Sequence, residues 1–237
     1  MIQTVTVLDL ETTGLDPKKD KIIEIGAIKI VDGMEAGRFQ TMVSPGRRLD
    51  EVITEITGIG EKDLENAPDP GSVLPDFLTF ADTECILGHC VLFDYSFLKR
   101  NAVNLGLTFE KKGLDTLLMA RKYLPELPSR SLGNLCQYFG IPHNAHRALE
   151  DTVATWELYR KLCENFPVEQ DFQPAQLVYQ VKKESPITRH QIQLLERFLA
   201  YHNLESDRDI AKMTRNEASR YLDKMILRYG RAPGKSE

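Results

Sequence analysis

The first strongly patterned stretch of the chain is VTVLDLETTGLD, residues 5–16. Side chains alternate between the two faces of a strand, so Val5, Val7, Asp9 and Glu11 share one face. The pattern predicts a buried strand that carries two carboxylates, with Cα atoms roughly 6.5 to 7 Å apart. Burial of two like charges raises their pKa values unless a positive partner is present, and a divalent cation is the simplest such partner. The alternative is a strand that runs out into solvent at Asp9.

Hydrophobic periodicity predicts the other elements of the first 164 residues. Strands are expected at 4–10, 21–31 and 37–43, which form an antiparallel meander before an irregular segment at 44–69. A short strand is expected at 84–88, and helices at 71–81, 92–105, 115–122, 131–139 and 148–164. Strands followed by alternating elements predict an α/β fold, a mixed sheet of antiparallel and parallel strands flanked by helices.

Two more helices are expected near the C-terminus, because Thr188 with Gln191 and Thr214 with Glu217 are capping-box pairs. Apolar residues at helical spacing follow each pair, so the two helices are expected to pack as a hairpin. Prolines and acids in ENFPVEQDFQPAQ, residues 164–176, mark the joint. The expected division is a domain at 1–166, a linker at 167–185, the helical hairpin module at 186–230 and a tail at 231–237.

Composition limits the class of protein. The chain has 237 residues, of which 42% are hydrophobic and 27% charged, which is ordinary for a soluble protein. No apolar run is long enough to span a membrane and the start lacks a signal-peptide pattern, so we expect a cytoplasmic protein with no membrane partner. The four cysteines form no C-x-x-C pair, which favours reduced thiols over disulfides or a zinc site.

Charge is unevenly distributed along the chain. The net charge is −5, yet residues 174–237 contain 12 Lys and Arg against 8 Asp and Glu. Arg220, Lys224, Arg228 and Arg231 fall four, four and three apart and form a basic stripe on the last expected helix. The hypothesis is that this stripe holds a nucleic-acid backbone or docks a partner bound to nucleic acid. The alternative is an ordinary solvated helix face.

Two further acidic residues lie at positions that the sequence pattern predicts to be at least partly buried. Asp151 interrupts the apolar face of the helix at 148–164, and Asp94 lies where a strand passes into a helix. The structural alternative for each is an acid in the first turn of a helix, where the helix dipole stabilises a negative charge. His146, five residues before Asp151, adds a group that titrates near neutrality. Four carboxylates and one imidazole are what a two-cation phosphoryl-transfer site requires.

Three ordered motifs resemble those of the DEDDh subfamily of 3′→5′ exonucleases, the DnaQ-like group that includes polymerase proofreading subunits. The first motif stands as DLETTGL from Asp9, the second as GHCVLFDYSFL ending at Leu98, and the third as HRALED from His146 to Asp151. The tyrosine variant of the family places Tyr four residues before the last Asp, where this chain has Arg147. The resemblance covers about residues 1–164 and departs at Cys90, where the family usually has Asn.

The resemblance implies a fold, a chemistry and a product. The fold is RNase H-like, and the reaction releases nucleoside 5′-monophosphates from the 3′ end of DNA in proofreading or repair. The metal ligands it implies for two Mg²⁺ or Mn²⁺ ions are Asp9, Glu11, Asp94 and Asp151. His146 is implied to take the proton from the attacking water, and the ordinary pKa of histidine, near 6.5, suits that task at neutral pH.

The resemblance also implies a place for the terminal nucleotide. The backbone of Thr12, Thr13, Gly14 and Leu15 is expected to receive it, with Leu15 and Phe97 against its base. The implied partners are single-stranded or frayed 3′ ends of DNA and a polymerase or another replication or repair protein. Three other polar residues near the motifs, Glu24, His89 and His143, are expected to be structural.

Two alternatives remain open at the level of sequence. An RNA-trimming 3′→5′ exoribonuclease could use the same scaffold, since recognition of the 2′-hydroxyl depends on details that no motif reveals. A catalytically silent module that only binds a polymerase is the alternative outside the enzyme class. The presence of all five motif residues favours the enzyme.

Overall fold

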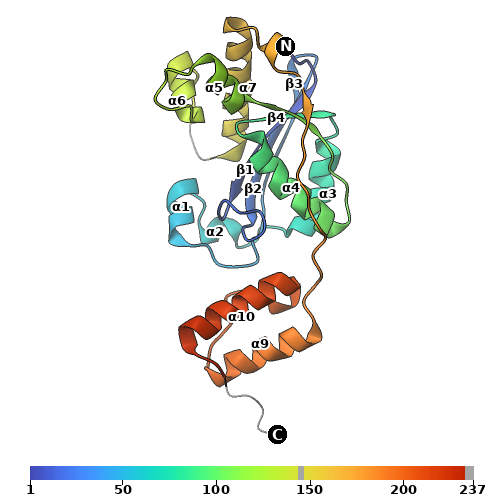
Figure 1. Cartoon of the computed structure of the whole chain (residues 1–237), viewed down its shortest axis with the longest axis vertical. Coiled ribbons are helices and arrows are strands. Elements are labelled where there is room, and N and C mark those ends of the chain that lie inside the picture. The colour runs from blue at the N-terminus through green and yellow to red at the C-terminus, as the bar shows by residue number, and fades with distance from the viewer. Residues whose placement is uncertain (144–146, 233–237) are drawn as a thin grey trace. The chain divides into compact units, whose positions relative to one another are not determined.

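The computed structural model describes residues 1–143 and 147–232, which form two compact units. Unit 1 comprises Met1–Pro45 and Leu49–Val181, and unit 2 comprises Gly46–Arg48 and Lys182–Glu237. Unit 1 contains a six-stranded sheet with helices on both faces (Figure 1). No helix in the described ranges is both long and apolar enough to cross a membrane.

The sheet of unit 1 is mixed, as the sequence predicts. Its strands are β1 (Val5–Thr12), β2 (Ile22–Val31), β3 (Met34–Met42), β4 (Cys85–Gly88), β5 (Lys112–Asp115) and β6 (Ala175–Gln176). Their order across the sheet is β3-β2-β1-β4-β5-β6. The meander β1 to β3 is antiparallel, β1, β4 and β5 pair in parallel, and β6 is antiparallel to β5.

Helices cover the two faces of this sheet. In unit 1 they are α1 (Glu51–Thr57), α2 (Glu61–Leu64), α3 (Pro70–Phe80), α4 (Val91–Leu105), α5 (Thr116–Tyr123), α6 (Leu132–Phe139), α7 (Ala148–Asn165) and α8 (Val168–Asp171). Leu8 and Leu10 belong to a core with α3 and α4 on one face, whereas Val5 and Val7 belong to a core with α5, α6 and α7 on the other (Figure 1). The alternation predicted for β1 therefore places Asp9 and Glu11 on the α7 face.

Tertiary packing forms several elements that local sequence did not indicate. The segment 44–69, expected to be irregular, contains α1 and α2, and buried Ile59 and Leu64 pack there against Ile23 of β2. Strand β5 was not expected either; it pairs with β4. These short elements have little periodicity of their own, and contacts made across the chain stabilise them.

The expected linker at 167–185 is wrong over its first part, because residues 167–181 belong to unit 1. Val168 is buried in the α7 core, and β6 pairs with β5. Leu177 and Tyr179 pack against the core on the α4 face. Prolines and acids in this segment indicate a joint, but its scattered apolar residues attach it to the sheet.

Unit 2 contains α9 (Arg189–Tyr201), the short 3-10 helix η1 (Ile210–Lys212) and α10 (Arg215–Tyr229). Both predicted capping boxes are confirmed at Thr188 and Thr214. The core of the unit contains Leu195 of α9 and Tyr221 of α10.

The expected hairpin arrangement of α9 and α10 is wrong, because the two helices run parallel. The Gln191 side chain near the start of α9 donates to the Arg215 carbonyl at 3.0 Å, at the start of α10. The His202 ring, just after α9, lies 6.0 Å from the ring of Tyr229 at the end of α10. The segment 202–214 returns the chain to the starting end, which capping signals alone do not reveal.

Candidate active site

Strand β1 supplies two of the candidate ligands from one face. Asp9 lies directly opposite Gly26 of β2, and Glu11 lies opposite Glu24. The same face carries Val5 and Val7 further back in the strand, where they are buried. The strand therefore changes from apolar to acidic along one face, at the end from which the turn 12–21 departs.

Gly26 allows the first turn of α7 to lie directly against the sheet. A Cβ at this position would come within 2.3 Å of the Ala148 carbonyl carbon and of the Leu149 nitrogen. Any larger residue at position 26 would push the helix away. Because Gly26 is opposite Asp9, α7 begins above the acidic end of β1, and Asp151 belongs to this first turn of the helix.

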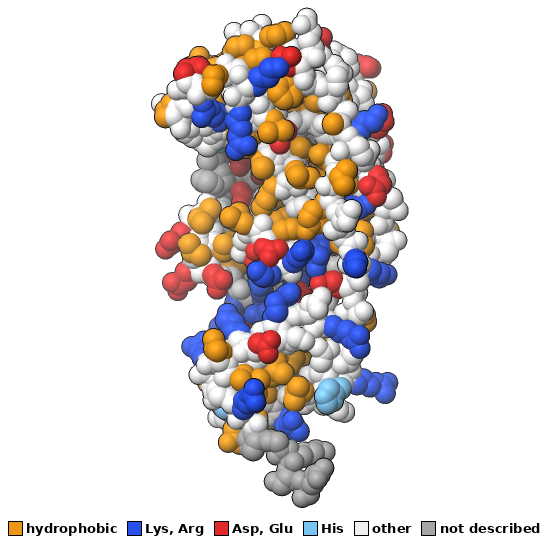
Figure 2. Space-filling view, in the orientation of Figure 1, with side chains coloured by type: hydrophobic (Ala, Val, Ile, Leu, Met, Phe, Trp, Pro, Cys, Tyr) orange, Lys and Arg blue, Asp and Glu red, His pale blue; other side chains and the backbone are white. Residues whose placement is uncertain are grey.

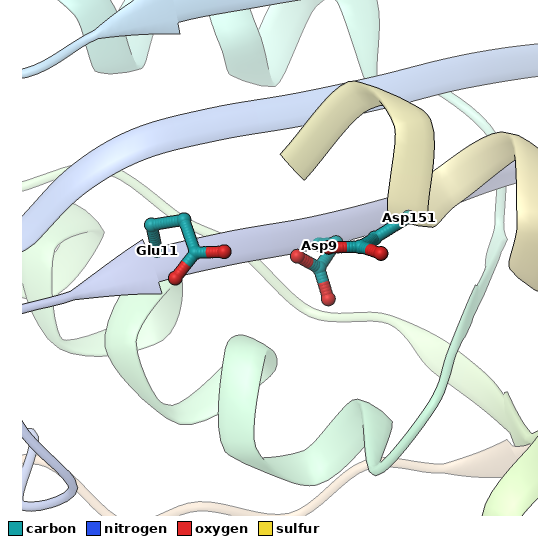
Figure 3. Close-up of side chains that lie close together, drawn as sticks. All are labelled: Asp9, Glu11 and Asp151. Atoms are coloured by element: carbon teal, nitrogen blue, oxygen red, sulfur yellow. The ribbon is translucent and has the colours of Figure 1, made fainter. Parts of the chain in front are cut away.

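Three carboxylates meet where β1 and α7 approach each other. Asp9, Glu11 and Asp151 each have a carboxylate oxygen within 4.8 Å of the others. Figure 3 shows Asp9 and Glu11 on β1 and Asp151 reaching from α7 toward Asp9. Asp94, in the first turn of α4, is buried beside them and accepts a hydrogen bond from the Leu10 nitrogen at 3.1 Å. Residues far apart in the sequence thus form one acidic cluster.

The pKa values of the cluster show the cost of this arrangement. Burial, and then the charges of Asp94 and Asp151, raise the pKa of Asp9 well above its usual value. Burial, followed by the charges of Asp151 and Glu24, raises the pKa of Glu11 to about 7. Burial also raises the pKa of Asp94 well above normal. A cation between these groups would remove the repulsion, and sets of carboxylate oxygens are the ligands that Mg²⁺ and Mn²⁺ prefer.

Glu24, expected to be structural, is a fully buried carboxylate that ties β2 to the start of α7. Its oxygens accept hydrogen bonds from the Gln40 side chain at 2.8 Å and from the Ala148 nitrogen at 3.3 Å. The Arg147 guanidinium lies 3.5 Å away. Neither its position opposite Glu11 nor its contact with α7 was predicted from the sequence.

The three histidines near the motifs have different outcomes. His146, the predicted base, lies outside the described residues. His143 hydrogen-bonds through Nε2 to Oδ1 of Asp151, a contact with the cluster that its sequence position did not indicate. His89 is held on both ring nitrogens, by the Thr116 hydroxyl and the Arg130 carbonyl, each at 2.9 Å. Burial lowers the pKa of His89.

The turn after β1 is closely bonded and exposes one apolar side chain. Thr12 donates through its hydroxyl to the Gly14 carbonyl at 2.7 Å, and the Thr13 nitrogen donates to the Lys21 carbonyl at 2.8 Å. A Cβ on Gly14 would come within 2.5 Å of an Asp20 carboxylate oxygen, so a larger residue here would displace the Asp20 side chain. Leu15 is 84% exposed beside these groups.

Phe97 corrects one expectation. Its side chain is fully buried in the core on the α4 face, with its ring centre 5.0 Å from that of Phe93. A ring without exposed surface does not stack on a base, so the predicted contact of Phe97 with nucleic acid is wrong. Helical spacing placed Phe93 and Phe97 on one face without indicating that this face is the core.

Cys90 occupies an unusual backbone position at the start of α4. It is exposed and has a φ of 76°. This left-handed conformation is one that Asn adopts more readily than most other residues. Its nitrogen donates to Asp115 at 3.2 Å.

The predicted basic stripe lies in unit 2. Arg220, Lys224 and Arg228 are all exposed on α10, whereas Ala218 and Tyr221 of the same helix are buried. The stripe and the acidic cluster therefore belong to separate compact units.

Comparison with known proteins places this site in a family. The model of the RNase T exonuclease family matches residues 6–159 of the chain. The DNA polymerase III subunit epsilon of Aquifex aeolicus is 36% identical over 163 residues, which cover 68% of this chain and 81% of that protein. The chain belongs to the exonuclease family, and a 3′→5′ direction is in keeping with that membership.

Two further similarities define the extent of the match. The DNA polymerase III PolC-type of Thermotoga petrophila is 40% identical over 163 residues, but the chain spans only 12% of that protein's length. Escherichia coli exonuclease I in complex with a dA16 oligonucleotide has a TM-score of 0.63 and 22% identity, covering 72% of this chain and 42% of that one. The fold is thus the RNase H-like fold of the exonucleases. The family match ends before α9 and α10, the two α-helices of unit 2.

Proposed function

We propose that this chain is a divalent-metal-dependent 3′→5′ DNA exonuclease that releases nucleoside 5′-monophosphates. The observation that carries the proposal is the cluster of Asp9, Glu11 and Asp151 with Asp94 beside it. Asp9 and Asp94 have pKa values raised well above normal by burial in this cluster. A fold that brings like charges together at this cost favours a function that uses a cation.

The cluster fits divalent cations by its donor set. Asp9, Glu11, Asp94 and Asp151 supply only carboxylate oxygens, and no cysteine belongs to the group among the described residues. Mg²⁺ or Mn²⁺ is therefore the proposed cofactor, with two ions per site. When bound, the pair supplies positive charge that stabilises both the attacking and the leaving oxygen of the phosphodiester.

Other residues of the chain have proposed tasks in the same reaction. His146 accepts the proton of the attacking water as general base. The bonded turn of Thr12, Thr13 and Gly14 offers a fixed backbone for the terminal nucleotide, and the exposed Leu15 side chain lies against its base. A rigid turn suits this task because it positions the 3′ end without a further ordering cost.

The substrate and partner are proposed by similarity. Relatives are named DNA polymerase III epsilon subunit and PolC-type, and exonuclease I has been solved with a DNA oligonucleotide. Single-stranded or frayed 3′ ends of DNA are the proposed substrate, and a polymerase is the proposed partner.

The test is nucleotide release from an end-labelled single strand. With a 3′ label and Mg²⁺ or Mn²⁺, labelled mononucleotide should appear at once; with a 5′ label the strand should shorten as a ladder. EDTA should stop both. Labelled mononucleotide appearing first from the 5′ label, or release that persists in EDTA, would contradict the proposal. An RNA strand of the same sequence, run in parallel, should be degraded more slowly; faster degradation would favour the exoribonuclease alternative.

A further inference from the structure

Unit 2 presents a surface that the proposed reaction does not use. On α10, Ala218 and Tyr221 face the core of the unit, while Arg220, Lys224 and Arg228 are exposed. At a rise of 1.5 Å per residue, a spacing of four residues places successive cations about 6 Å apart along the helix. Asp223 is the single acid between the first and the last of them in sequence. This linear spacing suits a ligand whose negative charges also repeat along a line.

The stripe ends at exposed aromatic side chains. The Arg228 guanidinium lies 5.4 Å from the ring centre of Tyr229, which is 38% exposed. The ring of His202 lies 6.0 Å from that of Tyr229 and 4.8 Å from that of Tyr201, which is 58% exposed. The parallel course of α9 and α10 is what brings these tyrosines to the same end of the unit.

The charge of unit 2 agrees with an anionic ligand. Lys and Arg outnumber Asp and Glu by 12 to 8 in residues 182–237. On the face shown in Figure 2, the part of the chain around α9 and α10 likewise shows more Lys and Arg than acidic side chains. Basic residues that follow a backbone, combined with aromatic rings, are how proteins hold single strands without reading their sequence.

We propose that the surface of Arg220, Lys224, Arg228, Tyr201 and Tyr229, called here the basic-aromatic surface, binds single-stranded DNA. The three cations contact successive phosphates, and the two tyrosines stack on bases. The proposal rests on the proposed function only in taking a DNA strand as the ligand. Its test measures binding without turnover, so the two can fail separately.

The experiment is fluorescence anisotropy of the full chain with a labelled oligodeoxythymidylate in EDTA, over a range of salt. A strand of about 30 nucleotides exceeds the site size of a single binding module. The variant Arg220→Gln/Lys224→Gln/Arg228→Gln keeps helix-compatible side chains and removes three charges. Its dissociation constant should rise about tenfold or more, and its log–log salt slope should become shallower by about 2, at about 0.7 per lost phosphate contact.

The matched control removes three exposed charges of unit 2 that lie off the stripe, as Arg189→Gln/Arg197→Gln/Lys212→Gln. This control should bind nearly as wild type, because position and not net charge determines the contact. Tyr229→Ala should weaken binding more than Tyr201→Phe, which keeps a stacking ring. Circular dichroism checks that each variant is folded.

Two results would overturn the basic-aromatic surface. One is a stripe variant that binds the long strand as tightly as wild type at every salt concentration, and the other is a control triple that weakens binding equally. A strand-binding defect in the stripe variant, in a protein that releases no nucleotide, would leave this surface intact and remove the proposed nuclease function.

A second inference concerns Glu24 of unit 1, and it rests on contacts that are independent of the basic-aromatic surface. Among the described residues, its hydrogen-bonding or ionic partners are Gln40 of β3, Arg147 and the Ala148 nitrogen at the start of α7. The carboxylate has no exposed surface, and its charge adds to the repulsion felt by Asp9 and Glu11. A buried group that worsens the repulsion in the cluster needs another reason for its position.

The geometry points to Glu24 as a positioning residue for the acidic cluster. It holds the first turn of α7 against β2 by accepting from the Ala148 nitrogen, and Asp151 extends from this same turn, three residues further on. Loss of this hydrogen bond frees the helix start and widens the separation of Asp151 from Asp9 and Glu11. This inference rests on the proposed function, because the cluster is taken as a cation site.

The test is calorimetric titration of metal-free protein with Mn²⁺. Glu24→Ala should weaken Mn²⁺ binding about 10-fold or more, the size of effect known for groups that orient metal ligands. Glu24→Gln can still accept from the Ala148 nitrogen and should retain most of the affinity. Thr83→Val is the control: it removes a buried hydrogen bond to Thr6, made through the hydroxyls at 2.7 Å. It should lower the melting temperature and leave the Mn²⁺ affinity unchanged.

The possible outcomes distinguish a positioning role of Glu24 from a merely structural one. Glu24→Ala that lowers the melting temperature but binds Mn²⁺ as wild type would show a merely structural role. If this variant does not fold, Gln40→Ala removes one donor to Glu24 and should weaken Mn²⁺ binding to a smaller extent; unchanged affinity would overturn the inference. Wild-type protein that binds no Mn²⁺ would instead contradict the proposed function itself.

Discussion

The acidic cluster of unit 1 and the basic stripe of unit 2 are both groups of like charges, but they differ in how the fold assembles them and in how far they are buried. The acids come from β1, α4 and α7 and meet only because the chain folds, whereas the cations lie along one helix. The acids are recessed, and burial raises the pKa values of Asp9 and Asp94 well above normal. The cations are exposed, where water and salt screen their repulsion. A cluster of buried like charges is therefore strong evidence of a functional site. A row of exposed like charges is evidence of a binding site only when other ligand-binding groups, such as aromatic side chains, lie beside it.

The largest effect is expected from the buried group. Asp9→Asn removes a proposed metal ligand at the centre of the cluster, so turnover of a labelled strand should fall by about 10³-fold or more. The same change relieves repulsion, so thermal unfolding in EDTA at pH 8 should show an equal or higher melting temperature. A variant that keeps near-normal turnover would remove the cation site from the reaction.

Substitution of the proposed base should have the next largest effect. His146→Ala should lower turnover at saturating Mn²⁺ by about 10²-fold, because general-base catalysis by one residue has this size. Mn²⁺ affinity, measured by calorimetry, should not change, since the residue acts on water. His143→Ala is the comparison variant, and a greater loss of turnover there would transfer the proposed role to His143.

The pH dependence of stability follows from the raised pKa of Glu11. The folded, metal-free protein holds a proton up to about pH 7, which the unfolded chain releases near 4.5. This group therefore stabilises the fold fully below the lower value and loses its contribution, up to about 3 kcal/mol, as the pH rises through the higher one. Melting temperatures in EDTA should fall from pH 5 to pH 8, and the fall should be smaller in Glu11→Gln. An equal fall in both proteins would contradict the assignment.

The smallest effect is expected at the exposed Leu15. Leu15→Ala should raise KM for a single strand several-fold with little change in kcat, because one apolar contact with a base contributes about 1 kcal/mol. Leu105→Ala, another exposed leucine at the end of α4, serves as the control. A change in kcat alone would place Leu15 outside substrate binding.

Sequence predicted the acidic cluster better than its surroundings. The alternation in β1 placed Asp9 and Glu11 on the face that α7 covers, because a period of two is a local property of strands. The ordered motifs added Asp94 and Asp151. The contact of Glu24 with the start of α7 depends on how a helix crosses a sheet at Gly26, and no local pattern encodes that crossing.

In unit 2 the sequence predicted the local structure but not the arrangement of the helices. Its caps at Thr188 and Thr214 were readable, because a capping box is formed within four residues. The direction of α10 relative to α9 was not, since it depends on the return segment 202–214. Burial of Phe97 was missed for a related reason: helical spacing shows which residues share a face and leaves open which partner that face meets.

The central claim is that the cluster of Asp9, Glu11, Asp94 and Asp151 is a two-cation site. Its most direct test is an anomalous difference map from crystals of the full chain soaked in Mn²⁺. Two peaks are expected among these four carboxylates, about 3.5 to 4 Å apart, with ligand distances near 2.0 to 2.3 Å. The same map from Asp9→Asn should lose at least one peak. A wild-type map with no peak at the cluster, or with Mn²⁺ bound only elsewhere on the chain, would contradict the account.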